Sequence, residues 1–221
     1  MMQLDSFTNG VLLAIFIGGV FAIICMKPGG ILHSTGRRIR SAQPSRWTLQ
    51  EFIRLRSKPG SKSSFLFSEE SVYSMGHRFN GRFDNAILHW EDAPVLDAII
   101  ERKFPTRYVP DRPREEDFFQ AELYALALME IGVSCSTAKL VLVYCLQRNA
   151  RNCIGNNQVD CMSCGKGAVY SRRFNQKRVL KALAKLDEIW YQERQPEASP
   201  SAGKCGGCPY GRNGVCNHTA A

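Results

Sequence analysis

The sequence has 221 residues, 44% of them apolar, which is enough for one domain with a sizeable core. It contains nine cysteines, an odd number, and several fall as C-x2-C, which argues against a disulfide framework and favours thiolate metal ligation in a reducing compartment. The formal net charge of +9 is unevenly spread: residues 27–62 carry +8, residues 63–138 carry −6 and residues 139–221 carry +8. Basic flanks around an acidic centre suit a polyanion that approaches carboxylates, and they also fit a solvated surface beside a membrane.

The chain begins with an apolar segment, residues 7–26, which has no charged side chain from Gly10 to Met26. Its length is close to that of a bilayer-spanning helix. A cleaved signal peptide is one alternative, but no basic residue precedes the run and no A-x-A-like site closes it. A buried soluble helix is the second alternative. Basic residues after the run place the remaining chain in the cytoplasm, so we expect a single-pass membrane protein.

Residues 27–46 are rich in Gly, Ser, Pro and Arg and are expected to form a basic linker. Residues 47–56 have helical spacing, with Thr48 as the N-cap and Glu51 at the third helical position. Short strands are expected within 65–85, followed by a strand that runs from Asp84 through Trp90 and a buried strand at 95–103. A helix at 114–131, ended by Gly132, comes next. A buried strand at 139–146, a strand at 168–174 and an amphipathic helix at 175–194 complete the order. This order predicts an α/β fold, a mixed β-sheet with helices on its faces.

The acidic centre contains a pattern that predicts a metal site. Asp84 and Glu101 fall on neighbouring predicted strands, so their carboxylates can converge. Together with a backbone carbonyl, that of Arg102, they would supply the oxygen ligands that Mg²⁺ or Mn²⁺ prefers. Glu101 and Lys103 share a strand face, which places the lysine to hold an attacking water and to offset charge on a phosphate. A bound metal would lower the pKa of that water.

Gln120 and Tyr124 are four residues apart on one face of the predicted helix 114–131. Both can donate hydrogen bonds that orient the lysine, the nucleophile or a nucleic-acid backbone. Each motif is common by itself: an E-x-K pair is more often a surface ion pair, and a lone tyrosine is more often a core aromatic. Their order and their strand and helix contexts together predict a metal-dependent phosphodiesterase site that acts on nucleic acid.

Three motifs also resemble those of a known family: G-x-x-D at Gly81–Asp84, E-x-K at Glu101–Lys103 and Q-x-x-x-Y at Gln120–Tyr124. They resemble the PD-(D/E)XK nuclease superfamily, and the third resembles its RecB-like branch, which includes the CRISPR-associated RecB-type exonucleases. The resemblance covers residues 65–216. It implies a restriction-endonuclease-like fold over residues 47–221 and a divalent-metal nuclease that acts on DNA, with exonuclease-like action. The implied roles are metal ligand for Asp84 and Glu101, catalytic lysine for Lys103 and accessory pair for Gln120 and Tyr124.

Members of this family also often carry an acid or a histidine on their first helix. Glu51 is the acidic residue that the sequence offers there.

Six cysteines form two mirrored groups. Cys205-x2-Cys208-x7-Cys216 lies in the C-terminal tail, residues 204–218, and Cys153-x7-Cys161-x2-Cys164 lies in a predicted insertion, residues 147–167. One interpretation is tetrahedral zinc held by Cys161, Cys164, Cys205 and Cys208, and the other is an iron–sulfur cluster held by four of the six. Either would clamp the tail to the insertion and stabilise the fold. Six free thiols are the third alternative.

The nuclease resemblance bears on this choice, because related nucleases often hold a four-iron–four-sulfur cluster with one cysteine before the core and three at the C-terminus. The last three cysteines of this chain resemble that pattern. Cys25, however, is the sole cysteine before Asp84 and lies inside the apolar run. Cys135 and Cys145 lie near or within apolar strands and are expected in the core.

The sequence therefore predicts a membrane-tethered DNA nuclease. A catalytically silent nucleic-acid-binding or scaffold protein of the same fold is the first alternative. A membrane protein with a cysteine-ligated metal module and no nucleic-acid role is the second. The nuclease is preferred because Asp84, Glu101 and Lys103 are all present.

Overall fold

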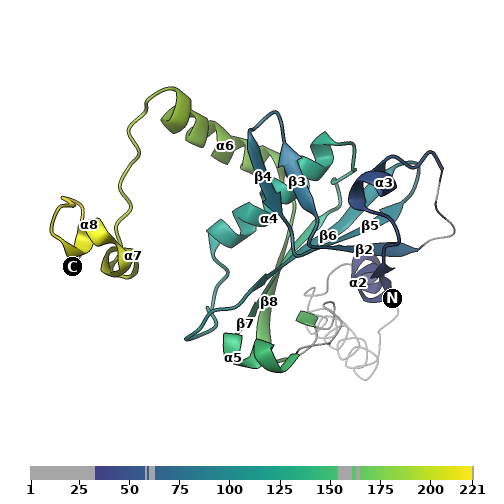
Figure 1. Cartoon of the computed structure of the whole chain (residues 1–221), viewed down its shortest axis with the longest axis horizontal. Helices are drawn as coiled ribbons and strands as arrows, with labels where there is room; N and C mark the ends of the chain where they lie inside the picture. Colours follow the sequence, from purple (N-terminus) through teal and green to yellow (C-terminus); the bar gives the residue numbers. More distant parts are fainter. Residues whose placement is uncertain (1–32, 58, 60–62, 154–160, 163–164, 221) are drawn as a thin grey trace, which may run out of the picture. The chain divides into compact units, whose positions relative to one another are not determined.

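A computed structural model of the chain describes residues 33–57, 59, 63–153, 161–162 and 165–220 (Figure 1). It divides into two compact units, residues 1–175 and residues 176–221. The first unit contains the β-sheet and all five predicted catalytic residues. The predicted membrane segment, residues 7–26, lies outside the described residues, and no helix within them is long and apolar enough to cross a bilayer.

The first unit is built on a six-stranded mixed sheet with the order β1-β2-β5-β6-β7-β8. The pairs β1–β2 and β6–β7 are parallel and the other neighbours are antiparallel. The prediction of a mixed sheet flanked by helices is confirmed. The strands are β1 (Gln43–Pro44), β2 (Ser64–Ser68), β5 (Asn85–Trp90), β6 (Pro94–Lys103), β7 (Lys139–Cys145) and β8 (Gly167–Arg173).

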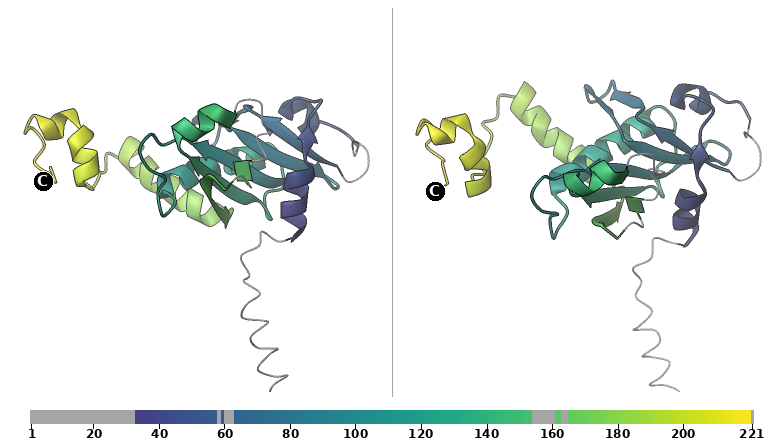
Figure 2. Two further views of the ribbon diagram at one scale, coloured as in Figure 1. Left: turned by 90° about the horizontal axis from the view of Figure 1, so that it is seen from below. Right: turned by 60° about the horizontal axis from the view of Figure 1, so that its bottom comes forward.

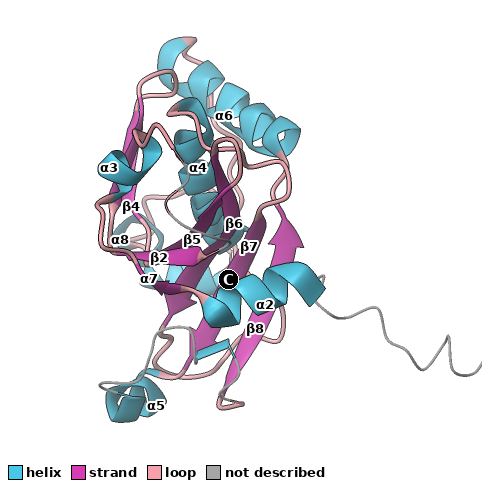
Figure 3. Ribbon diagram, turned by 90° about the vertical axis from the view of Figure 1, so that its right-hand side faces the viewer, coloured by secondary structure: helices cyan, strands magenta, loops and turns pink. Residues whose placement is uncertain are grey.

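The long strand β6 lies between β5 and β7, and its first eight residues are buried. Successive residues of a strand point to opposite faces. Ile100 belongs to a buried cluster that includes Ile39 of α2 (His33–Ser41), whereas Lys103 reaches Gln120 of α4 (Glu115–Glu130) on the opposite face. Figure 3 shows α2 and α4 on the two sides of the sheet. Both faces of β6 are therefore covered, which explains why five of the six residues from Val95 to Ile100 are apolar.

Helix α4 was predicted at residues 114–131 and forms at Glu115–Glu130. Three acidic residues fill its first turn, where negative charge interacts favourably with the helix dipole. Gly132 follows the helix with a φ of +98°, a conformation that glycine adopts without steric cost. The buried side chains lie all around the helix: Phe118, Ala121, Glu122, Tyr124, Ala125, Leu126, Ala127 and Leu128.

A two-stranded hairpin, β3 (Ser71–Ser74) and β4 (Phe79–Arg82), packs against α4. The hydroxyl of Ser74 donates a hydrogen bond of 2.9 Å to Glu130 near the end of that helix. Strand β4 begins at Phe79, so Gly81 is a strand residue. This placement brings Gly81 against α4 rather than into solvent.

The prediction of a basic linker at residues 27–46 is wrong for residues 33–44. These residues form α2 and the short strand β1, which pairs with β2 at the edge of the sheet. Figure 2 shows α2, β1 and α3 (Leu49–Ile53) following one another beside β2. The reason is tertiary: Ile39 is 1% exposed and packs on Ile87, Ala98 and Ile100, so one buried side chain holds a basic segment in place.

An ionic cluster centred on the buried side chains of His89 and Asp97 also holds α2. The Arg38 guanidinium donates to Asp97 Oδ1 at 3.0 Å, and His89 Nδ1 lies 2.8 Å from Asp97 Oδ2. His89 Nε2 lies 3.0 Å from Glu91 Oε1. Ile87 pairs with Ala98 but Leu88 pairs with Leu96, so Asp97 is the extra residue of a β-bulge, which turns its side chain toward α2.

Helix α3 begins at the predicted N-cap. Thr48 accepts from the N–H of Glu51, and the Glu51 carboxylate accepts from the N–H of Thr48, which completes a capping box. Cys135 and Cys145 are buried, as expected. The second unit contains α6 (Gln176–Tyr191), α7 (Ala202–Gly207) and α8 (Pro209–Arg212), and α6 matches the predicted helix at 175–194.

The ionic cluster predicts a pH-dependent stability. Burial lowers the pKa of His89, but hydrogen bonds to Asp97 and Glu91 outweigh this effect, so the pKa is raised above the ordinary 6.5. The stabilisation from the charged imidazole is therefore complete below pH 6.5 and is lost as the pH rises through the higher folded-state pKa. We expect the stability difference between the unmutated chain and His89→Gln to shrink from about pH 6 to about pH 8.5, measured by urea unfolding. A difference that is constant over this range would contradict the prediction.

Candidate active site

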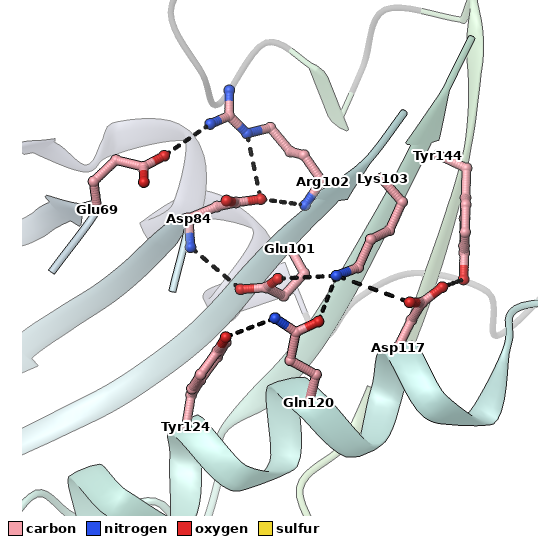
Figure 4. Close-up of polar contacts among 9 residues, drawn as sticks. All are labelled: Glu69, Asp84, Glu101, Arg102, Lys103, Asp117, Gln120, Tyr124 and Tyr144. Carbon is pink, nitrogen blue, oxygen red and sulfur yellow. Dashed lines mark hydrogen bonds and ion pairs between the residues drawn. The ribbon is translucent and has the colours of Figure 1, made fainter. Parts of the chain in front are cut away.

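The five predicted catalytic residues come together at the end of β6. Asp84 precedes β5, Glu101 and Lys103 lie on β6, and Gln120 and Tyr124 lie on α4 (Figure 4). Asp84 was predicted on a strand but lies one residue before β5, opposite Glu101 of the neighbouring strand β6. The prediction that Glu101 and Lys103 share a face is confirmed. Three segments far apart in the sequence therefore build one polar site.

Asp84 and β6 are joined by a pair of hydrogen bonds that run in opposite directions. The N–H of Arg102 donates to Asp84 Oδ2 at 2.6 Å, and the N–H of Asp84 donates to Glu101 Oε1 at 3.2 Å. Asn85 pairs with Ile100, so Asp84 lies opposite Glu101 just beyond the end of the β5–β6 ladder. The two carboxylates are thus fixed by backbone groups of each other's segments. We call this pair of bonds the carboxylate latch.

Glu101 is the most perturbed acid of the site. Its side chain is 3% exposed, and burial together with the charge of Asp84 raises its pKa to about 7, against the opposing effect of Lys103. Each acid has a cation nearby, Lys103 at 3.4 Å from Glu101 and Arg102 at 3.7 Å from Asp84, yet the pKa of Glu101 stays raised, so the pair still favours further positive charge. A divalent cation would supply it, and Mg²⁺ is commonly held by one or two carboxylates with several waters. The donor set of Asp84 and Glu101 therefore fits Mg²⁺ or Mn²⁺.

No group of three or more His, Cys, Asp or Glu side chains within the described part of the chain is arranged to hold a metal ion. A cation at Asp84 and Glu101 would accordingly need waters or backbone oxygens to complete its shell. The carbonyl of Arg102, expected as the third ligand, stays a prediction. The contact that the structure gives for the backbone of Arg102 at this point is its N–H bond to Asp84.

Lys103 is held between the strand and the helix. Its Nζ donates to Gln120 Oε1 at 2.5 Å and to Glu101 Oε2 at 3.4 Å, and it lies 3.8 Å from Asp117 Oδ1. The side chain is 23% exposed, so its ammonium group is fixed yet reachable from solvent. This combination places a positive charge beside the carboxylates without neutralising both of them.

Gln120 is held by Tyr124, which in turn lies against Gly81. Its Nε2 donates to the phenolic oxygen of Tyr124 at 2.6 Å, which leaves the amide oxygen directed at Lys103. Burial raises the pKa of Tyr124, so the phenol stays protonated. The Tyr124 ring lies against Gly81, where a Cβ atom would come within 2.5 Å of ring atom Cε1. The glycine of the G-x-x-D motif is thus required for space.

Sequence reasoning missed Asp117 and Tyr144. Asp117 lies one turn before Gln120 on α4, and the Tyr144 hydroxyl on β7 donates to its Oδ2 at 2.5 Å. The same hydroxyl accepts from the N–H of Arg114 at 3.1 Å. Burial and the bond to Asp117 raise the pKa of Tyr144 to about 12. The i, i+3 spacing of Asp117 and Gln120 was the signal that could have found the aspartate.

Glu69 and the Arg102 side chain were also missed. Glu69 has a φ of +56° in the turn after β2 and forms ion pairs with Arg82 at 3.2 Å and Arg102 at 3.5 Å. Arg102 Nε lies 3.7 Å from Asp84 Oδ2. No local sequence pattern marks Glu69, because its ion pairs with Arg82 and Arg102 depend on the conformation of the turn. Glu51, the acid of the first helix, forms the capping box of α3 instead.

The cysteine clamp stays a prediction. Cys153 Sγ donates to the carbonyl of Asn149 at 3.4 Å, and Cys161 packs against the core cluster around Ile39. Cys164 lies outside the described residues. The remaining three predicted ligands, Cys205, Cys208 and Cys216, belong to the second unit.

Comparison of the sequence with protein-family models and with curated proteins finds no match. The resemblance to PD-(D/E)XK nucleases therefore rests on the motifs, and it stays a prediction.

The contact between Gly81 and Tyr124 predicts a sharp steric effect. We expect Gly81→Ala to destabilise the chain by about 1–3 kcal/mol, because the buried ring must move. Gly76→Ala in the same hairpin is the matched control: its Cβ would meet Glu130 Oε1 at 3.6 Å, an ordinary contact, so its effect should stay within about 0.5 kcal/mol. Urea unfolding of both variants measures the difference. An equal loss of stability in Gly81→Ala and Gly76→Ala would contradict the steric contact between Gly81 and Tyr124.

The raised pKa of Glu101 predicts that the site destabilises the metal-free fold. Because the folded-state pKa is about 7 rather than 4.5, the folded state loses stability as the pH rises through this interval. Glu101→Gln remains neutral, so it should raise the free energy of unfolding by about 1–2 kcal/mol at pH 8 in chelator and leave it unchanged near pH 4.5.

Asp92→Asn, at an exposed carboxylate, is the control and should show no such gain. Urea unfolding at both pH values, with and without Mg²⁺, measures the effect. Added Mg²⁺ should stabilise the unmutated chain relative to Glu101→Gln. If the unmutated chain were more stable than Glu101→Gln in chelator at pH 8, the prediction would be contradicted.

Proposed function

We propose that this chain is a divalent-metal-dependent nuclease that hydrolyses DNA phosphodiester bonds, with exonuclease-like action and a restriction-endonuclease-like fold. The observation that carries the proposal is the position of the Lys103 ammonium. It lies between the Glu101 carboxylate and the Gln120 amide, while Asp84 faces Glu101 from the neighbouring segment. An ammonium beside two converging carboxylates suits the hydrolysis of a phosphodiester by water.

Each residue has a distinct role in the proposal. Asp84 and Glu101 would hold Mg²⁺ or Mn²⁺. That cation, when bound, lowers the pKa of a water and offsets charge on the phosphate. Lys103 fixes the attacking water by a hydrogen bond and stabilises the negative charge that grows on the phosphate oxygens. Gln120 and Tyr124 are positioning residues, because they set the direction of the Lys103 side chain.

The latch has a role here as well. Since backbone N–H groups direct one oxygen of each carboxylate, the two acids cannot turn away from each other without losing a hydrogen bond. Preorganisation of this kind avoids a reorganisation cost during the reaction. It supports a catalytic role for the pair over a solvated surface pair.

Two further parts of the proposal rest on the sequence alone. The apolar run at residues 7–26 would tether the nuclease to a membrane with its catalytic unit on the cytoplasmic side. Four of the cysteines 153, 161, 164, 205, 208 and 216 would hold a four-iron–four-sulfur cluster or zinc. Iron and zinc analysis of the purified chain distinguishes these two metals.

The proposal predicts that Lys103→Ala lowers the rate of Mn²⁺-dependent cleavage of linear DNA by at least about 100-fold, because a charge aimed at the reacting phosphate is removed. Lys139→Ala is the matched control, since Lys139 is also half-buried but lies at the other end of the parallel β6–β7 ladder. Gel analysis of end-labelled DNA measures the rates.

Cleavage by Lys103→Ala at the unmutated rate would show that the assigned site is wrong. Metal-independent DNA binding without cleavage by the unmutated chain would favour the catalytically silent alternative. Both assays should use the full chain, so that the membrane segment and both units are present.

A further inference from the structure

The loop between β6 and α4, residues 104–114, begins directly after Lys103 and was not among the predicted site residues. It exposes two aromatic side chains, Phe104 at 45% and Tyr108 at 68%. Arginines at 107, 112 and 114 are exposed on the same loop, against one acid, Asp111, which gives a net charge of +2.

The loop is pinned to the sheet. The carbonyl of Pro105 accepts from the N–H of Gln147 at 3.0 Å, and the carbonyl of Pro110 accepts from the Tyr170 hydroxyl at 2.8 Å. At its end, the N–H of Arg114 donates to the Tyr144 hydroxyl. Three prolines, at 105, 110 and 113, restrict the backbone further. The backbone that carries the two exposed rings is therefore restrained at both ends and in the middle.

The loop is continuous with the candidate active site. The Arg102 guanidinium lies 6.0 Å from the centroid of the Phe104 ring, and the same side chain approaches Asp84 at 3.7 Å. Tyr144, which holds the end of the loop, also donates to Asp117 beside Lys103. A nucleic-acid strand that contacts the loop would thus lie close to the carboxylates of the candidate active site.

We propose that Phe104, Arg107 and Tyr108 form a platform for single-stranded DNA, on which bases stack and a phosphate pairs with the arginine. The inference rests on the proposed nuclease function and names its substrate as an unpaired strand. Aromatic side chains stack on the faces of unpaired bases of any sequence, and arginines attract the backbone. In a duplex, those faces are covered by neighbouring base pairs. The aromatic loop would therefore select single strands without selecting sequence.

The test is fluorescence anisotropy of the full chain with a labelled 20-nucleotide single strand and with its duplex, in Ca²⁺. The unmutated chain should bind the single strand at least about 10-fold more tightly than the duplex. Tyr108→Ala and Phe104→Ala should each weaken single-strand binding by about 5- to 100-fold, and Tyr108→Phe should retain it. Arg107→Ala should reduce the salt dependence by about one counterion.

Matched controls come from the same unit. Tyr73→Ala removes a tyrosine of β3 that is 52% exposed, and Arg40→Ala removes an exposed arginine of α2; neither should change binding of the single strand. Unchanged binding in Tyr108→Ala and Phe104→Ala would overturn the platform, as would equal affinity of the unmutated chain for single strand and duplex.

Cleavage assays separate this inference from the proposed function. Cleavage by the unmutated chain together with unaltered binding in the loop variants removes the platform and leaves the nuclease. Loss of binding in the loop variants, with no cleavage by the unmutated chain, removes the nuclease and leaves a single-strand-binding platform.

Discussion

The carboxylate latch is the constraint on which the site depends. Asp84 and Glu101 carry like charges, and burial makes their approach costly, as the pKa of about 7 for Glu101 indicates. They stay together because each accepts a backbone N–H from the other's segment. That arrangement requires β5 and β6 to remain in register up to the pair Asn85 and Ile100. The fold thus tolerates an unfavourable pair of acids at the proposed metal site.

Polar side chains on one face of α4 support the position of Lys103. Asp117, Gln120 and Tyr124 follow each other at spacings of three and four residues, so one helix presents three polar groups to Lys103 and its surroundings. Each group is held from outside the helix: Asp117 by Tyr144, and Tyr124 by the flat surface at Gly81. The lysine is therefore positioned by β4, β7 and α4 together, and a shift of any of them reaches its ammonium group.

Sequence could predict the site where local periodicity carries the information. The i+2 spacing of Glu101 and Lys103 and the i+4 spacing of Gln120 and Tyr124 determine their shared faces. It could not predict what depends on tertiary context: α2, which one buried side chain, Ile39, and the Arg38–Asp97 pair hold to the sheet, the bulge at Asp97, and Glu69 in a left-handed turn. The prediction of a linker failed because α2 is too polar for a hydrophobic stripe to show.

The net charge of −6 over residues 63–138 suggests a region that repels DNA, but the contacts argue otherwise. Several of its acids are engaged in ion pairs: Asp97 with Arg38, Glu69 with Arg82 and Arg102, and Glu130 with His77. Glu115 and Glu122 both meet Arg172 of β8. The loop at residues 104–114, which follows Lys103, adds exposed arginines. A bound cation at Asp84 and Glu101 would offset two more negative charges, and the formally acidic centre would then be locally attractive to a polyanion.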